Sequence, residues 1–406
     1  ALYNIVDQIF IGWGVGYLGN GATNIVFPIT IITLALAVLV GDGGAAYLSL
    51  KLGEGDMASL KKGVGNSVVM VTIAGIALLV ITLVFMDPIL TLFGATDALR
   101  PYAEEYGYVI AIGLPFTMIS TALNAMIRAD GSPKFAMFSM VLGAVINTIF
   151  DPIFIFALGM GVRGAAIATV MGQVASFVVS VLYLPRFKTC HLDRSAFRLH
   201  LRVCKNVLSL GVSSFITQIA ITIVMTLFNN LLAIYGAESI YGAEIPLTAM
   251  GIVMKVNQIM LSILVGIAVG AQPVIGFNYG CKNFDRVKKA FELAIFAAEV
   301  IAVIAFLIFE FAVMCFRIFL MLCPLNGFQT VTAIYLQAIG KPVKSAIVTL
   351  ARQIVFLIPA ALILPQMMGV TGVLWSGPVA DALAFILALS FVLYDRKQLK
   401  KVPVQE

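Results

Sequence analysis

The 406-residue sequence has few charged residues, and it lacks the residue groups from which most enzymes build their sites. Asp, Glu, Lys and Arg make up 11% of it, and its two His, His191 and His200, lie in one basic stretch. The five Cys show no paired spacing, which argues against a disulfide framework or a Cys/His metal site. No glycine-rich phosphate loop and no Ser–His arrangement is present. We therefore expect neither an enzyme nor a bound cofactor.

Hydrophobic residues, in contrast, make up 61% of the sequence, and the mean hydropathy is +1.03. A soluble globular domain does not have this composition, so the chain is predicted to cross a membrane many times. About 20 apolar residues are needed for each crossing. Twelve segments qualify: 1–18, 22–50, 62–86, 102–127, 134–158, 162–185, 203–235, 245–278, 287–309, 311–337, 342–364 and 369–394. The predicted fold is an all-α polytopic membrane protein with twelve transmembrane helices.

The Lys and Arg residues are distributed unevenly between the loops on the two sides. The loops after the second, fourth, sixth, eighth and tenth segments and the C-terminal tail hold 21 of the 26, whereas the opposite loops hold only Arg100 and Arg163. Basic loops stay in the cytoplasm, so we expect a multi-pass protein of the inner cell membrane with both termini cytoplasmic. Because the sequence starts inside an apolar segment, we expect that natural N-terminal residues precede Ala1.

The two halves of the chain resemble each other. Residues 160–177 match 368–385 at an offset of 208, and residues 115–133 match 324–342 at an offset of 209. Six helices precede the second copy, so both copies have the same topology and an axis along the membrane normal should relate them. The predicted domains are an N-lobe at 1–187, a cytoplasmic linker at 188–202, a C-lobe at 203–395 and a cytoplasmic tail at 396–406. The basic stretch 186–206 fits either an amphipathic helix on the membrane or a solvated linker.

Polar residues at bilayer depth are concentrated in the first half. Asn147 and Asp151 are four residues apart and share one helix face, about 6 Å apart. Asp7 and Thr169 fall at a matching depth, roughly 10–16 Å below the outer surface, and Tyr106 reaches a similar depth. Carboxylates inside a membrane are costly and usually functional.

The second half lacks this polar cluster. Asp7 aligns with Asn229 and Thr169 with Gly377, while apolar residues align with Asn147 and Asp151. A purely structural role would be needed in both copies, so the asymmetry favours function. Two carboxylates in one low-dielectric site need a shared proton or a cation between them. Because carboxylate, amide and hydroxyl oxygens suit both Na⁺ and H⁺, either ion fits. Repeats of this kind are typical of transporters, although a few channels share them.

Three motifs at these positions resemble the multidrug and toxic compound extrusion (MATE) family, in its bacterial multidrug-efflux branch. They are VDQIFIG at 6–12, N-x-x-x-D-P at 147–152 and GAAIAT at 164–169. The resemblance covers the whole chain and implies an antiporter that exports cationic, amphipathic drugs in exchange for Na⁺ or H⁺ by alternating access. It implies a cation-coupling site at Asp7, Asn147, Asp151 and Thr169, which would hold Na⁺ if Na⁺ is the ion. Tyr106 and Asn124 match further family positions.

The resemblance also raises alternatives and further candidates. A family acidic residue is absent from 213–224, where only Gln218 is polar enough to replace it, so a coupling site in the C-lobe is doubtful. Asp42 and Lys255 are intramembrane charges that could serve either function or packing. A lipid-linked oligosaccharide flippase of the same superfamily is the alternative, and it would need more cavity cations than this chain offers. Expected partners are small cationic or amphipathic drugs and membrane lipids, with no nucleic acid, and the protein should be a monomer.

Two structural features are also expected. The offset between the copies falls from 227 to 209, so the second copy is 18 residues shorter, and we expect a missing segment near Glu310. Arg352 and Asp381 lie on adjacent antiparallel helices at depths that differ by about one turn, roughly 6 Å. Because lone charges are disfavoured in a membrane, we expect these two residues to pair.

Overall fold

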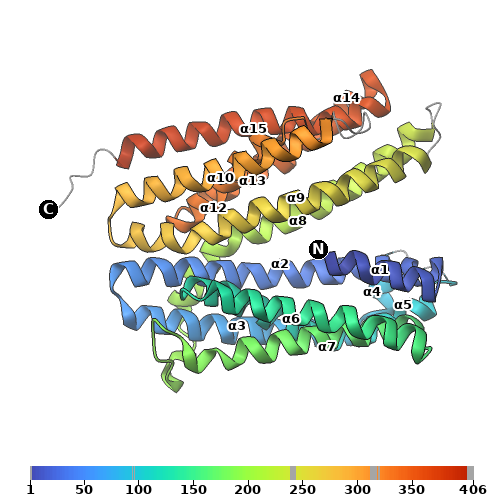
Figure 1. Ribbon diagram of the computed structural model, residues 1–406, viewed down its shortest axis with the longest axis horizontal. Coiled ribbons are helices and arrows are strands. Elements are labelled where there is room, and N and C mark those ends of the chain that lie inside the picture. Colours follow the sequence, from blue (N-terminus) through green and yellow to red (C-terminus); the bar gives the residue numbers. More distant parts are fainter. Residues whose placement is uncertain are drawn as a thin grey trace. The chain divides into compact units, whose positions relative to one another are not determined.

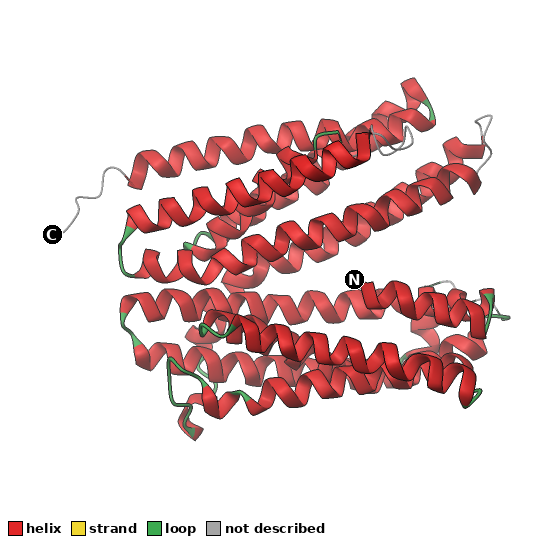
Figure 2. Ribbon diagram, in the orientation of Figure 1, coloured by secondary structure: helices red, strands yellow, loops and turns green. Residues whose placement is uncertain are grey.

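The computed structural model describes residues 2–93, 95, 97–237, 244–310, 318 and 321–399. Within these residues the chain consists of helices and loops, and no strand is present (Figure 2). The chain divides into two compact units, Ala1–Gly211 and Val212–Glu406. Figure 1 colours the first unit from blue to green and the second from yellow-green to red. The protein is thus an all-α polytopic membrane protein, as its composition predicts.

Helices α1 to α7 form the N-lobe (Figure 1). Their bounds are α1 Leu2–Gly14, α2 Tyr17–Glu54, α3 Met57–Val84, α4 Met86–Leu92, α5 Arg100–Ala129, α6 Pro133–Pro152, the π-helical turn η1 Ile153–Ala157, and α7 Gly161–Leu182. The short helix α4 was not expected, because its seven residues are too few to cross a membrane. Two 3₁₀ turns follow, η2 Leu184–Arg186 and η3 Arg194–Phe197.

Helices α8 to α15 form the C-lobe. Their bounds are α8 Leu201–Ala237, α9 Glu244–Gly280, α10 Phe284–Glu310, α12 Cys323–Ala338, α13 Pro342–Leu350, the π-helical turn η4 Ala351–Leu357, α14 Ile358–Met368 and α15 Val370–Leu399. Each of the twelve predicted spans overlaps one helix or one run of helices. Nine helices in the described part of the chain are long and apolar enough to cross a membrane by themselves.

Matching turns at the basic ends of the lobes support the internal repeat. Gly131 follows α5 with φ +79°, and Gly340 follows α12 with φ +76°. Both glycines hold the left-handed conformation that ends a helix, and both precede a proline by two residues, Pro133 and Pro342. Each proline occupies the first turn of the next helix, where its missing N–H costs nothing. The same local chemistry therefore reverses the chain at the same place in both copies.

The linker after α7 forms two short 3₁₀ turns and no continuous helix, and it is anchored to the N-lobe at several points while much of it is exposed. The buried Asp130 carboxylate accepts hydrogen bonds from Tyr183 Oη at 2.7 Å, the Lys188 N–H at 2.8 Å, and the N–H and Oγ1 of Thr189 at 2.9 and 2.6 Å. These four donors satisfy the carboxylate in place of water. They hold residues 183–189 against the end of α5.

A second anchor holds the later part of the linker. The fully buried Asn66 on α3 donates from Nδ2 to the carbonyl oxygens of Ala196 and Arg198, at 3.2 and 3.0 Å. Its Oδ1 accepts from the His200 N–H at 2.7 Å and lies 3.3 Å from Cys204 Sγ. The compact N-terminal unit consequently extends to Gly211, past the predicted end of the N-lobe at residue 187.

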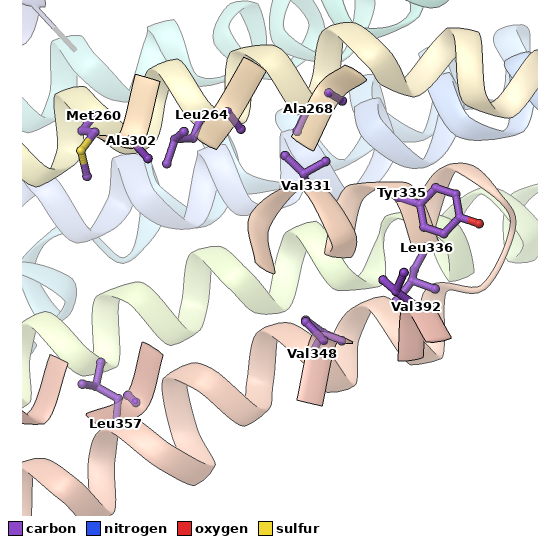
Figure 3. Packing of buried hydrophobic residues seen from close by; sticks show 14 of the residues in the cluster. Met260, Leu264, Ala268, Ala302, Val331, Tyr335, Leu336, Val348, Leu357 and Val392 are labelled. Atoms are coloured by element: carbon purple, nitrogen blue, oxygen red, sulfur yellow. The ribbon is translucent and has the colours of Figure 1, made fainter. Parts of the chain in front are cut away.

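The C-lobe has its own apolar core, in which small and large side chains alternate. Met260 and Leu264 on α9 pack with Ala302 on α10, while Leu336 on α12 lies beside Val392 on α15 (Figure 3). Tyr335 stacks on Phe291 with ring centroids 4.2 Å apart. Lipid tails are as apolar as these side chains, so moving the side chains from lipid into the core brings no hydrophobic gain. Close packing therefore holds these helices together.

The predicted ion pair of the C-lobe is confirmed. Arg352 Nε on η4 donates to Asp381 Oδ1 on α15 at 2.6 Å, and both side chains are largely buried. The expected missing segment near Glu310 falls next to residues that the structure does not describe. Helix α10 continues unbroken to Glu310, and residues 311–317 lie outside the described residues. The shorter loop in the second copy stays a prediction.

We predict that Asp130→Ala releases the linker. The substitution leaves four donors without their acceptor, so we expect a loss of roughly 2–4 kcal/mol of stability. Trypsin should then cut the folded protein in detergent faster after Arg186 or Lys188, separating two fragments on a gel.

Asp193→Ala is the control, since Asp193 lies in the same linker with an exposed side chain and only a 3.6 Å ion pair to Lys61. Equal cleavage rates for the parent and both variants would show that Asp130 does not anchor the linker.

Candidate functional site

The polar residues predicted in α6 and α7 meet in the structure. Asn147 Nδ2 on α6 donates to Asp151 Oδ1 at 3.1 Å and to Thr169 Oγ1 on α7 at 3.2 Å. Both Asn147 and Asp151 are buried. The amide nitrogen has two hydrogens, and these two bonds use both. The amide is therefore fixed, with its own oxygen Oδ1 turned away from Asp151.

Close backbone packing brings the two helices together at this point. A side-chain carbon at Gly143 on α6 would lie 2.7 Å from the carbonyl oxygen of Gly172 on α7, and one at Gly172 would collide with the Gly143 carbonyl. Only glycine permits this approach. Asn147 lies one turn from Gly143, and Thr169 lies one turn from Gly172. The two glycines thus set the distance at which Asn147 can reach Thr169.

Asp7 joins the cluster from α1. Its carboxyl group and that of Asp151 lie within hydrogen-bonding contact of each other, and both are buried. A side-chain carbon at Gly14 on α1 would collide with Ile155 on η1, so this glycine lets α1 lie directly against the end of α6. A bond between two carboxyl groups requires a proton, and without one they repel each other strongly in a low-dielectric site. The pair is a place where a positive charge is needed.

Three oxygen atoms of the cluster have no hydrogen-bond donor among the described residues. They are Asp7 Oδ1, Asn147 Oδ1 and Asp151 Oδ2, and all three are buried. Buried acceptors without partners are rare, and each calls for an explanation. Buried carboxylate and amide oxygens of this kind are ligands that suit a hard cation such as Na⁺, and the carboxylates can also take up a proton.

Tyr106 lies near this cluster, within the apolar packing around it. It is buried with Ile11 on α1 and Ile155 on η1, each one turn beyond Asp7 and Asp151 respectively. The site is therefore closed by apolar side chains on the side of the outer loops, as its predicted depth requires. That apolar surround strengthens electrostatic interactions inside it.

Asn124 lies elsewhere, in a cluster of serines near the basic end of the N-lobe. Its Oδ1 accepts from Ser180 Oγ at 3.3 Å, and Ser180 Oγ is 2.9 Å from Ser139 Oγ. Eighteen residues along α5 separate Asn124 from Tyr106, about 27 Å on an ideal helix. Asn124 thus lies far along α5 from Tyr106, which shares an apolar cluster with Ile11 and Ile155.

Of the remaining candidates, Asp42 and Gln218 lie apart from the carboxyl pair, and the side chain of Lys255 is not described. Asp42 on α2 interacts electrostatically with Arg128 at the end of α5, which favours a packing role. Gln218 on α8 is half-buried in the C-lobe. The side chains of Lys255 and of Asn229, the counterpart of Asp7, are outside the described residues.

Two further amide residues of the N-lobe were missed from the sequence. Gln173 Oε1 and Asn20 Oδ1 are buried and find no donor among the described residues. Gln173 follows Thr169 by one helical turn, and Asn20 lies in the first turn of α2. The i, i+4 spacing from Thr169 was the available signal for Gln173, whereas nothing in the sequence places Asn20 near α1.

Known proteins with the same sequence pattern are membrane transporters. A profile of the MatE family matches residues 1–153 and 214–313. The Multidrug export protein MepA of Staphylococcus aureus (strain N315) is 25% identical over 418 residues, which cover 98% of this chain and 91% of that protein.

Solved structures with a similar fold are also membrane transporters. The outward-facing conformation of a multidrug resistance MATE family transporter of the MOP superfamily has a TM-score of 0.92 and 25% identity, and the match covers 99% of this chain and 93% of that one. The MATE multidrug transporter DinF-BH has a TM-score of 0.88 and 32% identity, with coverages of 97% and 92%.

We predict opposite stability changes when the buried aspartates of the two lobes are neutralised. Asp151→Asn removes one of two like charges and keeps an oxygen for Asn147, so thermal stability should stay the same or rise. Asp381→Asn instead leaves the buried Arg352 guanidinium without its counter-charge, which costs about 3–5 kcal/mol.

Thermal unfolding in detergent without Na⁺ tests this at about pH 8, where free carboxyl groups are ionised. Acidification to about pH 5 should stabilise the parent relative to Asp151→Asn, because a proton then relieves the repulsion. A similar destabilisation by both substitutions would mean that the Asp7–Asp151 site carries no electrostatic conflict.

Proposed function

Because the chain belongs to the MATE family of multidrug efflux transporters, we propose that it exports cationic, amphipathic compounds in exchange for Na⁺ or H⁺. The observation that carries the coupling is the convergence of Asp7, Asn147 and Asp151, each with a buried oxygen that lacks a donor among the described residues. Export of drugs is supported by the MepA relative and by the similarity to the multidrug transporter DinF-BH.

The bound ion determines whether the carboxyl groups of Asp7 and Asp151 can stay in contact. With both groups ionised and no cation between them, repulsion pushes Asp7 on α1 away from Asp151 on α6. A proton or Na⁺ removes the repulsion and lets α1 pack against α6 and η1. Coupling thus requires only that the two arrangements of α1 differ in their affinity for the ion.

Helix α1 is suited to such a change. It ends at Gly14 and is followed by Gly16 with φ +84° before α2 begins at Tyr17. Glycines at the junction with α2 allow α1 to bend or repack at low cost. A bias of about 5.5 kcal/mol suffices to invert a two-state population from 1:99 to 99:1. One ion between two buried carboxylates can supply energies of this order.

Drug and ion then compete through the shape of the N-lobe. When α1 repacks around the neutralised pair, the drug cavity beside it changes shape and releases the drug outward. When the ion leaves toward the cytoplasm, the cavity can accept a drug again. Alternating access follows, with one ion-bound and one drug-bound arrangement.

The C-lobe supports this assignment by contrast. Its two buried aspartates among the described residues already have counter-charges: Asp381 pairs with Arg352 at 2.6 Å, and Asp395 pairs with Lys341 and Lys344. A resident guanidinium leaves no place for a mobile cation, so the N-lobe is the coupling lobe. The same bond ties up Arg352, which an anionic-headgroup flippase would need as a free cation, so drug export is the better proposal.

The proposed orientation follows from the loops. The basic ends of the helices, with 21 of the 26 Lys and Arg, face the cytoplasm, and both termini lie there. The carboxyl pair then lies in the outer half of the inner membrane, where it exchanges ions with the outside. The protein acts as a monomer, with one site per chain.

The decisive prediction concerns coupled export from proteoliposomes. Asp7→Asn and Asp151→Asn should each reduce ion-driven export of a cationic dye to the rate of protein-free vesicles, because neither variant can change charge with the ion. Dye fluorescence is followed under a Na⁺ gradient at equal pH, and separately under a pH gradient without Na⁺. The gradient that drives the parent identifies the coupling ion.

Asn229→Ala, at the matching position of the other lobe, is the control and should keep most of the parent's rate. Monodisperse elution of every variant in detergent shows that the protein is folded. Undiminished export by Asp7→Asn, or an equal loss with Asn229→Ala, would contradict coupling in the N-lobe.

A further inference from the structure

The repeat provides a second comparison between the lobes, at the basic end of each bundle. At the alignment offsets given above, Phe135 on α6 corresponds to Lys344 on α13. Tyr183, directly after α7, corresponds to Phe391 on α15, and Phe187 in the linker corresponds to Asp395. The two copies use equivalent backbone positions for different chemistry.

In the N-lobe these positions form a closed aromatic corner. The Phe135 and Tyr183 ring centroids are 4.8 Å apart, and those of Tyr183 and Phe187 are 5.4 Å apart. Tyr183 and Phe187 are buried, and the Tyr183 hydroxyl donates to Asp130. The linker forms part of this corner and closes it.

In the C-lobe the corner is charged. Lys344 Nζ lies 3.0 Å from Asp395 Oδ1 and 4.6 Å from the centroid of the Tyr394 ring. Lys341 Nζ is 3.1 Å from the same carboxylate oxygen. The Asp395 side chain is 1% exposed, while those of Lys341 and Lys344 are 25% and 27% exposed. Two ammonium groups thus share one buried carboxylate, which leaves an excess positive charge on the accessible side.

A cavity of about 420 Å³ opens beside this charge. It is lined by Lys344, Leu387, Ser390, Phe391 and Tyr394. The four α15 residues have the spacing i, i+3, i+4, i+7 and therefore share one face of the helix. The neighbouring Val392 points the other way, into the C-lobe core beside Leu336 (Figure 3).

The cavity combines an apolar and a polar part along α15. Leu387 lies deeper in the span, by about two turns relative to Tyr394, whereas Lys344, Ser390 and Tyr394 lie toward the end of the helix. Lys and Tyr at the end of a span sit at the headgroup level of a membrane. A molecule that fits has an anionic head and an apolar tail that runs along the helix.

We propose that this cavity, lined by Lys344, Leu387, Ser390, Phe391 and Tyr394, binds an anionic phospholipid of the cytoplasmic leaflet. The phosphate lies against the Lys344 ammonium at the end of α15, and an acyl chain packs on Leu387 and Phe391. The excess charge of the lysine pair gives the preference for an anionic over a zwitterionic headgroup. The N-lobe lacks the site because aromatic rings and the linker occupy the equivalent corner.

Native mass spectrometry of the full chain in detergent tests the proposal by titration with phosphatidylglycerol and, separately, phosphatidylcholine. We expect the parent to bind one phosphatidylglycerol more tightly than Lys344→Gln by about five-fold, the effect of removing one cation beside an anionic lipid. Phosphatidylcholine should bind both proteins equally. Lys344→Gln leaves Lys341 to pair with Asp395, so the variant keeps the buried carboxylate neutralised.

Two further variants control for charge. Lys344→Arg keeps the cation and should retain the preference for phosphatidylglycerol. Lys134→Gln removes an exposed lysine at the basic end of the N-lobe, beside Phe135, and should bind as the parent does. An equal loss in Lys134→Gln would reduce the effect to overall charge and overturn the site.

Other occupants give different results. Displacement of the lipid by equimolar inorganic phosphate would indicate a site for free anions rather than a lipid. Binding that appears only after deletion of residues 400–406 would show that the chain's own tail fills the cavity. Equal binding by the parent and Lys344→Gln would overturn the proposal outright.

Discussion

Two carboxyl groups that meet inside a membrane without a resident counter-charge are the constraint on which this structure depends. Asp7 and Asp151 cannot both be ionised and remain in contact unless a positive charge joins them. The surrounding helices are built to force the contact. Gly14 brings α1 onto η1, and Gly143 brings α6 onto α7. The fold therefore creates an electrostatic conflict, and in the mechanism proposed above an ion from outside the protein resolves it.

The C-lobe shows that the same architecture can avoid the conflict. There the buried carboxylate of Asp381 is neutralised permanently by Arg352 from the neighbouring segment. A tethered guanidinium cannot leave, so its position does not depend on an ion gradient. The two bundles are similar in sequence and topology, and they differ in whether a buried carboxylate has a counter-charge from the chain itself; the proposed coupling rests on this difference.

The sequence was sufficient for the architecture because membrane helices are recognised by their length and hydropathy. It also predicted the ion pair Arg352–Asp381, since helix depth and the cost of lone charge leave few partners. The sequence could not predict contacts that depend on the direction in which a side chain points. Asn66 and Asp130 are ordinary polar residues near helix ends, and nothing local shows that they hold the linker. The unpartnered amide oxygen of Asn20, which has no donor among the described residues, depends likewise on how α1 meets α2.

The anchored linker bears on how the lobes can move. Asp130 and Asn66 hold residues 183–204 to the N-lobe, and the compact N-terminal unit continues to Gly211 within α8. A side-chain carbon at Gly211 would collide with the carbonyl of Leu39 on α2, so the start of α8 is packed against the N-lobe backbone. If the lobes change their arrangement during transport, the chain between them cannot bend in the linker without breaking these contacts. Bending that keeps these contacts would have to lie within α8 beyond Gly211, so the alternating access proposed above assigns the hinge to that helix.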